Sequence, residues 1–293
     1  MCGVAGFLCT SARKSDEELR EQAAAMTAPM APRGPDAEGV WTDAAAGIAL
    51  GHRRLAILDL SPAGHQPMTS ACGRYVLVYN GEIYNHLDLR PELESQGCRF
   101  RGHSDTETLL EAIARWGLEP ALRRSIGMFA FALWDRKERR LTLVRDRLGI
   151  KPLYYGWCGD TFFFASELKP LRAHPDFQAD IDREALSLLL RHNYVPAPHS
   201  IYRGIRKLPP GTQLTVRPDD RGRLSEPSSY WTLEEAVRRG RENPFRGSAR
   251  DAIDELESLL DHAGSAPPRG ALLVFDLDQF KFINDRDGHD AGD

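Results

Sequence analysis

Short apolar runs recur along the first 165 residues of the chain, separated by segments in which apolar residues return every three or four positions. The runs have the length and composition of strands that are buried on at least one face, and the intervening segments have the spacing of amphipathic helices. The expected strands are Val4–Leu8, Ile48–Gly51, Tyr75–Tyr79, Met128–Leu133, Leu141–Arg145 and Thr161–Ala165. The expected helices are Glu17–Met26, Leu87–Ser95 and Thr106–Arg115.

The order of these elements indicates the fold class. Strands follow one another in hairpin order, with the helices grouped between them, which predicts an α+β fold rather than a parallel sheet. Asp182–Arg191 has the pattern of a further helix, and a proline-rich segment follows it from Pro196 to Gly211. The stretch from Gly264 to Gly270 contains two prolines and is typical of a linker.

Composition narrows the class of protein without naming a function. The chain has 293 residues, 42% hydrophobic and 27% charged, which suits one large or two modest globular domains. A net charge of −4 does not indicate a basic surface for nucleic acid. No apolar run is long enough for a membrane helix. The five cysteines lack the spacing of metal ligands, so we expect no metal site, reduced thiols and a cytoplasmic location.

The cysteine at position two carries the strongest chemical signal. Removal of Met1 would leave the Cys2 thiol and a free α-amine on one residue, and these groups form a nucleophile and its own base. An amine that titrates at about 7.7–8.0 can accept the thiol proton and return one to a leaving group. The alternative is a small buried hydrophobic side chain, the commoner role of a lone cysteine. A secretory leader is not expected, because no Lys or Arg precedes the short apolar run.

Three further polar segments accompany this cysteine. They are Arg33-Gly34-Pro35-Asp36 with Gly51-His52-Arg53-Arg54-Leu55, then Tyr79-Asn80-Gly81-Glu82-Ile83-Tyr84-Asn85, and Gly102-His103-Ser104-Asp105-Thr106-Glu107. Each also has an ordinary structural interpretation. Arg54 fits a solvated surface charge, and Asp105 fits an acidic residue at the start of a helix. By turn chemistry alone, Asn80-Gly81 after an apolar run predicts a β-hairpin turn.

Together with Cys2, these segments resemble the class II (N-terminal nucleophile) glutamine amidotransferases, above all the glutaminase half of asparagine synthetase. The likeness runs from residue 1 to about residue 260 and implies a four-layer α/β/β/α Ntn-hydrolase sandwich of two antiparallel sheets. It also implies hydrolysis of glutamine to glutamate and ammonia through a Cys2 thioester. One departure is Pro32, where the family usually has His before Arg-Gly-Pro-Asp.

The resemblance assigns roles to six residues. Cys2 is the nucleophile, and Asn80 and Gly81 form the oxyanion hole with a side-chain amide and a backbone N–H. Arg54 matches the residue that binds the substrate carboxylate, which suits a guanidinium group because it can donate two parallel hydrogen bonds. Asp105 matches the acceptor of the α-ammonium, and Glu82 matches a substrate contact.

The resemblance also suggests a division of the chain. We expect a glutaminase domain over residues 1–180, a bridge and first synthetase helix over 181–262, a linker over 263–270 and a separate fragment over 271–293. The Ser-Gly-Gly-x-Asp-Ser loop that grips ATP in the synthetase domain is not found, so ATP and Mg²⁺ are implied only for that missing domain. The chain itself should need no cofactor. The expected partner is glutamine, and either a separate synthetase domain or a second copy of the chain stays open.

The last segment resembles the opening of a diguanylate cyclase (GGDEF) domain. Asp276 matches a Mg²⁺ ligand of that family, and Asn284 and Asp293 match guanine contacts. The segment ends before the family signature, so we interpret it as a vestigial or artificially joined fragment. Three alternatives to the asparagine synthetase type remain: another class II amidotransferase, a non-catalytic domain, or a fragment with a nucleotide-signalling tail.

We predict that these 293 residues alone make no asparagine. Asparagine formation requires aspartate to be activated with ATP, and residues 183–293 contain no phosphate-binding loop of the expected type. A coupled assay that follows glutamate, pyrophosphate and asparagine should detect glutamate alone, at a rate unaffected by ATP and aspartate. Pyrophosphate released in step with asparagine would reveal an ATP site that the sequence motifs do not show.

Overall fold

The computed structural model describes residues 1–10 and 14–264. The chain divides into one compact unit over Met1–Glu242 and a second that begins at Asn243. The GGDEF-like residues Asp276, Asn284 and Asp293 lie outside the described residues. In the second unit the described part forms one long helix, α8 (Ala249–Gly264), whose start is capped by reciprocal bonds between Ser248 and Asp251.

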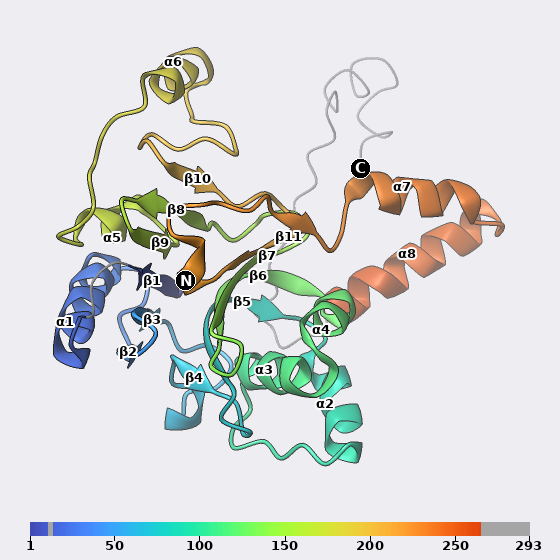
Figure 1. Ribbon diagram of the computed structural model, residues 1–293. Coiled ribbons are helices and arrows are strands. Elements are labelled where there is room, and N and C mark those ends of the chain that lie inside the picture. The colour runs from blue at the N-terminus through green and yellow to red at the C-terminus, as the bar shows by residue number, and fades with distance from the viewer. Residues whose placement is uncertain (11–13, 265–293) are drawn as a thin grey trace. The chain divides into compact units, whose positions relative to one another are not determined.

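The first unit is built on two antiparallel sheets of six strands each (Figure 1). The first sheet has the order β10-β8-β9-β1-β3-β2. Its strands are β1 (Gly3–Cys9), β2 (Ala37–Asp43), β3 (Ile48–Arg54), β8 (Tyr154–Cys158), β9 (Thr161–Ala165) and β10 (Ile205–Lys207). The N-terminal strand β1 therefore lies inside the sheet, paired on one side with β3 and on the other with β9.

The second sheet has the order β12-β11-β7-β6-β5-β4. Its strands are β4 (Met68–Thr69), β5 (Tyr75–Ile83), β6 (Gly127–Asp135), β7 (Arg140–Arg145), β11 (Thr212–Val216) and β12 (Ser228–Ser229). The edge strand β4 pairs only with the first half of β5, at Leu77 and Val76. The second half of β5, which carries Asn80, Gly81 and Glu82, is therefore paired with β6 alone.

Several of the helices cover the outer faces of the two sheets. The unit contains α1 (Asp16–Thr27), α2 (His86–Ser95), α3 (Asp105–Trp116), α4 (Leu118–Arg124), α5 (Leu168–Arg172), α6 (Arg183–His192) and α7 (Leu233–Glu242), with short 3-10 turns at η1 (Ala28–Met30), η2 (Pro62–Gly64) and η3 (Pro218–Asp220). Helix α1 packs on β1, β2 and β3, and helix α3 packs on β5 (Figure 1). Ser15 caps α1 and Ser104 caps α3, each accepting a backbone N–H with its hydroxyl group.

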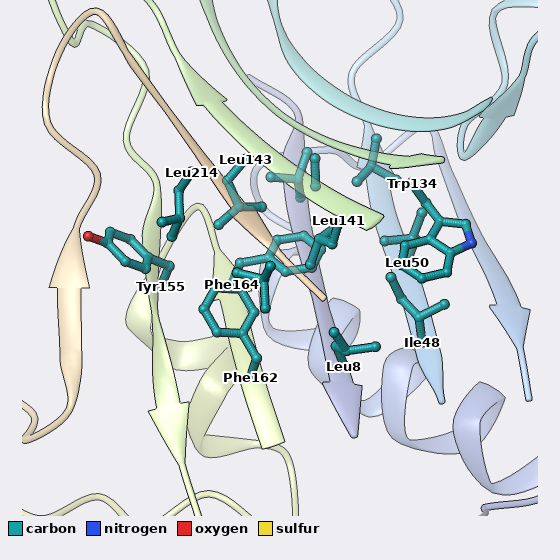
Figure 2. Close-up of a cluster of buried hydrophobic side chains, with 14 of the residues drawn as sticks. Leu8, Ile48, Leu50, Trp134, Leu141, Leu143, Tyr155, Phe162, Phe164 and Leu214 are labelled. Atoms are coloured by element: carbon teal, nitrogen blue, oxygen red, sulfur yellow. The ribbon is translucent and has the colours of Figure 1, made fainter. Parts of the chain in front are cut away.

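Three hydrophobic clusters define the layers. One lies between the sheets and includes Leu8, Leu50, Trp134 and Phe164, whose side chains come from both sheets and point toward one another (Figure 2). A second cluster joins α2, α3 and α4 to the outer face of β5 and β6, and a third joins α1 and α5 to the outer face of the first sheet. This arrangement confirms the predicted α/β/β/α sandwich.

Each strand and helix expected from the sequence is present, but several elements were missed. The half-buried strand β2 carries Glu38 and Asp43 among its seven residues, so it lacks a clear apolar pattern. The hairpin predicted at Asn80-Gly81 is wrong, because both residues lie inside β5, opposite Ala130 and Phe129. Here the pairing with β6 outweighs the local turn preference of the dipeptide.

The strands that complete both sheets come from late in the chain. Strand β10 pairs with β8, and strand β11 pairs with β7, although both follow the expected domain boundary at residue 180. The sheets thus use residues up to Ser229. The ranges 1–180 and 181–262 stay predictions about domains, but the folded unit itself continues past the first of them. None of the described helices is both long and apolar enough to cross a membrane.

His174 is a buried imidazole in the cluster between α1, α5 and the first sheet. Its ring lies edge-on to Phe7 and Phe163, with centroids 4.5 Å and 4.9 Å away. Burial, aided by the nearby charge of Lys14, lowers the pKa of His174 to about 4. The native state therefore holds this ring neutral at a pH where the unfolded chain is protonated.

We predict that this histidine makes the fold sensitive to acid. Between pH 6.5 and pH 4 the unfolded state binds more protons, so the stability present above pH 6.5 is lost as the pH falls, by about 2 kcal/mol at pH 5. Urea unfolding between pH 7 and pH 5 should show a smaller loss for His174→Gln than for the wild type. The exposed His192 offers the control His192→Gln. Parallel stability curves for wild type and His174→Gln would contradict the assignment.

Candidate functional site

Cys2 stands immediately before β1 and faces the layer between the sheets. Side chains alternate between the two faces of a strand, so the even-numbered residues Cys2, Val4 and Leu8 point to the same face. Val4 and Leu8 belong to the cluster between the sheets. The Cys2 thiol accepts the backbone N–H of Leu55 at 3.3 Å. The guanidinium group of Arg33 donates to the Cys2 carbonyl at 3.0 Å and pairs with Glu167 at 2.9 Å, so the start of the strand is held firmly.

Asn80 and Glu82 approach the same layer from the opposite sheet. Their side chains point to the same face of β5 as those of Val76 and Val78, which also belong to the cluster between the sheets. Strand β5 packs against both β1 and β3, and the His52 ring lies 3.0 Å from the Tyr79 carbonyl. The Asn80 side chain is buried, and its Nδ2 atom has no hydrogen-bond partner among the described residues. A buried amide donor without a partner is costly unless a ligand uses it.

Alternate backbone N–H groups in the second half of β5 point away from β6, to the side where no strand is paired. The N–H of Tyr79 donates to Gln66 at 2.7 Å, and the N–H of Ile83 donates to Asp105 at 2.9 Å. Because N–H direction alternates along a strand, the N–H of Gly81 points to the same side. A Cβ atom at Gly81 would overlap Phe129 on the neighbouring strand, which explains why this position is glycine.

Asp105 is fixed at the first residue of α3. Its carboxylate accepts the Tyr79 hydroxyl at 2.8 Å and the N–H groups of Ile83 at 2.9 Å and Thr106 at 2.8 Å. Only 5% of the residue is exposed, and this burial raises the pKa of the carboxyl group, whereas the hydrogen bonds oppose the rise. The structure therefore confirms the helix-start interpretation and also holds the carboxylate against β5, beside the predicted oxyanion residues.

Arg54 ends β3 and binds its own loop. Its guanidinium group donates to the carbonyls of Ser61, at 3.0 Å, and Asp59. These bonds hold the loop that follows Leu55, the residue whose N–H meets the Cys2 thiol. Arg54 is thus a partly buried loop anchor close to Cys2, and the interpretation as a solvated surface charge is wrong.

Electrostatics join these residues into one site. Burial raises the pKa of the Cys2 thiol, with a smaller rise from the Asp105 charge, whereas the Leu55 bond, the chain terminus and Arg54 lower it. Burial also raises the pKa of Glu82, and Asp105 adds to that rise. Burial lowers the pKa of the Met1 ammonium group. Cys2, Arg54, Glu82 and Asp105 therefore lie close enough for their charges to interact.

Several residues of this neighbourhood were not predicted. Tyr79 and Gln66 hold the second half of β5, and Lys151 places a buried ammonium group beside the N-terminus. Tyr79 lies inside one of the segments that carry the family resemblance, so its position was a usable signal. Gln66 had none, because its partner is a backbone amide far along the chain. The described residues contain no cluster of side chains suited to a metal ion.

Comparison with known proteins identifies the family. A family model described as glutamine amidotransferase domain matches residues 1–231. Asparagine synthetase [glutamine-hydrolyzing] 3 of Bacillus subtilis is 39% identical over 237 residues, covering 80% of this chain and 37% of that protein. Asparagine synthetase [glutamine-hydrolyzing] 1 of the same organism is 36% identical over 278 residues, covering 95% of this chain and 42% of that protein. The chain spans about two fifths of the length of these relatives.

A solved structure supports the fold. The glutamine phosphoribosylpyrophosphate amidotransferase of B. subtilis superimposes with a TM-score of 0.56 over 78% of this chain and 49% of its own, at 20% identity. At that identity the likeness concerns the fold alone. The match over residues 1–231, together with the predicted motifs, shows that the chain belongs to the glutamine amidotransferase family.

Proposed function

We propose that this chain hydrolyses glutamine to glutamate and ammonia, with Cys2 as the nucleophile once Met1 has been removed. One observation carries the proposal. The Cys2 thiol and the unpartnered Nδ2 of Asn80 come from opposite sheets and face the same buried layer. A nucleophile and an unused hydrogen-bond donor on facing strands are what an acyl-transfer site requires.

The reaction follows from these groups. The free α-amine of Cys2 takes the thiol proton, and the thiolate attacks the side-chain amide carbon of glutamine. The carbonyl π electrons move to oxygen, and the Asn80 side chain and the Gly81 N–H donate to this oxyanion. The amine returns the proton to the leaving nitrogen, so the C–N bond breaks and ammonia departs. Water then attacks the thioester through a second oxyanion and releases glutamate and the thiol.

The two ends of glutamine have complementary charges in the site. Arg54 is suited to the α-carboxylate, because a guanidinium group binds a carboxylate through paired hydrogen bonds. For this it would exchange a loop carbonyl for the substrate. Asp105 is suited to the α-ammonium, because its Oδ1 accepts only the Thr106 N–H and retains a free lone pair. Glu82 would complete the ammonium contact from β5.

The destination of the ammonia is a second part of the proposal. The relatives are named as glutamine-hydrolysing asparagine synthetases, so we propose that the ammonia serves the amidation of aspartate. That step would need ATP and Mg²⁺ in a synthetase domain, which a separate chain could provide. A stand-alone glutaminase of another class II amidotransferase is the alternative. Dependence of glutamine hydrolysis on ATP and aspartate, measured after a synthetase domain is added, would distinguish the two.

The nucleophile can be tested by labelling. We predict that diazo-oxo-norleucine, a glutamine-analogue electrophile, adds to Cys2 and to none of the other four cysteines. Iodoacetamide should instead react fastest with Cys72, which is exposed, because burial raises the pKa of the Cys2 thiol. Peptide mass spectrometry reads both patterns, with Cys2→Ser as the matched control. Labelling by the analogue at Cys72 or Cys98 would overturn the assignment, as would retention of Met1 in an active protein.

The oxyanion hole can be tested by kinetics. We predict that Asn80→Ala lowers kcat for glutamine hydrolysis by about 100- to 1000-fold, with a much smaller change in KM. The Asn80 donor is needed in the transition state and much less in the ground state. Gln178, an exposed amide, offers the control Gln178→Ala, which should behave as the wild type. A wild-type kcat for Asn80→Ala would remove Asn80 from the site.

A further inference from the structure

Lys151 is a buried cation without a bonded counterion. The residue is 6% exposed, and its Nζ atom donates to the Sδ atom of Met1 at 3.4 Å. No carboxylate of the described chain lies within ion-pair distance of this ammonium group. A thioether is a weak acceptor, and an unpaired buried charge is normally costly. The partner that Lys151 does have is the residue whose removal the proposed function requires.

Hydrogen bonds fix the backbone at Lys151 and with it the point from which the side chain extends. The Asp146 carboxylate accepts the N–H groups of Phe129, Leu148, Ile150 and Lys151 at 2.9–3.2 Å, which occupies both of its oxygens. The guanidinium group of Arg145 donates to the Lys151 carbonyl at 2.8 Å. Asp146 therefore organises the loop with its oxygens, and the Lys151 side chain continues beyond it toward the N-terminus.

The charges around Lys151 are those of the candidate site. Burial lowers the pKa of Lys151, and the charge of Arg33 lowers it further. The charges of Asp146, Glu82 and Cys2 raise it. In turn, Lys151 lowers the pKa of the N-terminal ammonium group and that of Glu82. Every charged group that faces Lys151 other than Asp146 thus lies at the nucleophile or beside it.

We infer that Lys151 is a positioning residue of the glutaminase site, whose ammonium group faces Cys2 after Met1 is removed and favours the reactive form of the nucleophile. The inference rests on the proposed function. The α-amine must be neutral before it can take the thiol proton, and the attacking species is the thiolate. A neighbouring positive charge keeps the amine unprotonated before the transfer and stabilises the thiolate once it has formed.

The test measures the thiol directly as well as turnover. In protein shown by intact mass to lack Met1, the rate of Cys2 carbamidomethylation by iodoacetamide is measured from pH 6 to pH 9.5, beside kcat/KM for glutamine. Lys151→Met should slow alkylation about three- to tenfold at pH 6.5, and the difference from the wild type should narrow as the pH rises toward 9.5. The kcat/KM profile should move to higher pH in parallel. Lys151→Arg, which keeps the charge, should restore both profiles.

The controls separate this inference from the proposed function. Lys137→Met removes an exposed charge on the turn between β6 and β7 and should leave both profiles unchanged. Active enzyme with overlapping alkylation profiles for wild type and Lys151→Met would overturn the inference and leave the proposed function intact. A wild type without glutaminase activity, but with the predicted alkylation difference, would overturn the proposed function alone. Lys151→Gln provides the neutral variant if Lys151→Met fails to fold, as judged by urea unfolding.

Discussion

The placement of β1 inside its sheet is the constraint on which the rest of the site depends. Hydrogen-bonded ladders on both sides fix the register of this strand, with Gly3 opposite Arg53 and Ala5 opposite Ala165. All seven of its residues are buried. The position of the Cys2 thiol, one residue before β1, is therefore set by the sheet rather than by a flexible terminus. Gly6 permits this packing, because a Cβ atom there would overlap the Phe164 ring.

The second sheet is built to present polar groups to that strand. Pairing with β6 keeps β5 extended through Asn80 and Gly81. Side chains of even number therefore face β1, while the backbone N–H groups of odd-numbered residues face the open edge. Asp146 fixes Phe129, the residue opposite Gly81, through bonds to both its N–H and its carbonyl. Asp146 thus ties the loop that carries Lys151 to β6, the strand that pairs with Asn80 and Gly81.

Much of the fold and the site could be predicted from the sequence, because strong apolar runs and adjacent motifs are local signals. The strand at Val4–Leu8 and the helix after Ser104 needed only their own residues. Asn80-Gly81 shows the limit of such reasoning, since its turn preference is overridden by a partner strand almost fifty residues away. The bond from Arg54 to its own loop and the position of Lys151 next to Met1 depend on tertiary packing, which no spacing rule encodes.

The open edge along the second half of β5 has a consequence for association between molecules. An exposed strand edge offers free N–H and carbonyl groups to the strands of other chains, and such edges promote aggregation unless they are covered. Here the N–H groups of Tyr79 and Ile83 are already taken by the side chains of Gln66 and Asp105, and His52 lies on the Tyr79 carbonyl. Side chains thus occupy the hydrogen-bonding groups on either side of Gly81 along this edge and leave the Gly81 N–H accessible to a ligand. An amide group small enough to be a substrate can reach a single N–H, whereas an intruding strand needs several in a row.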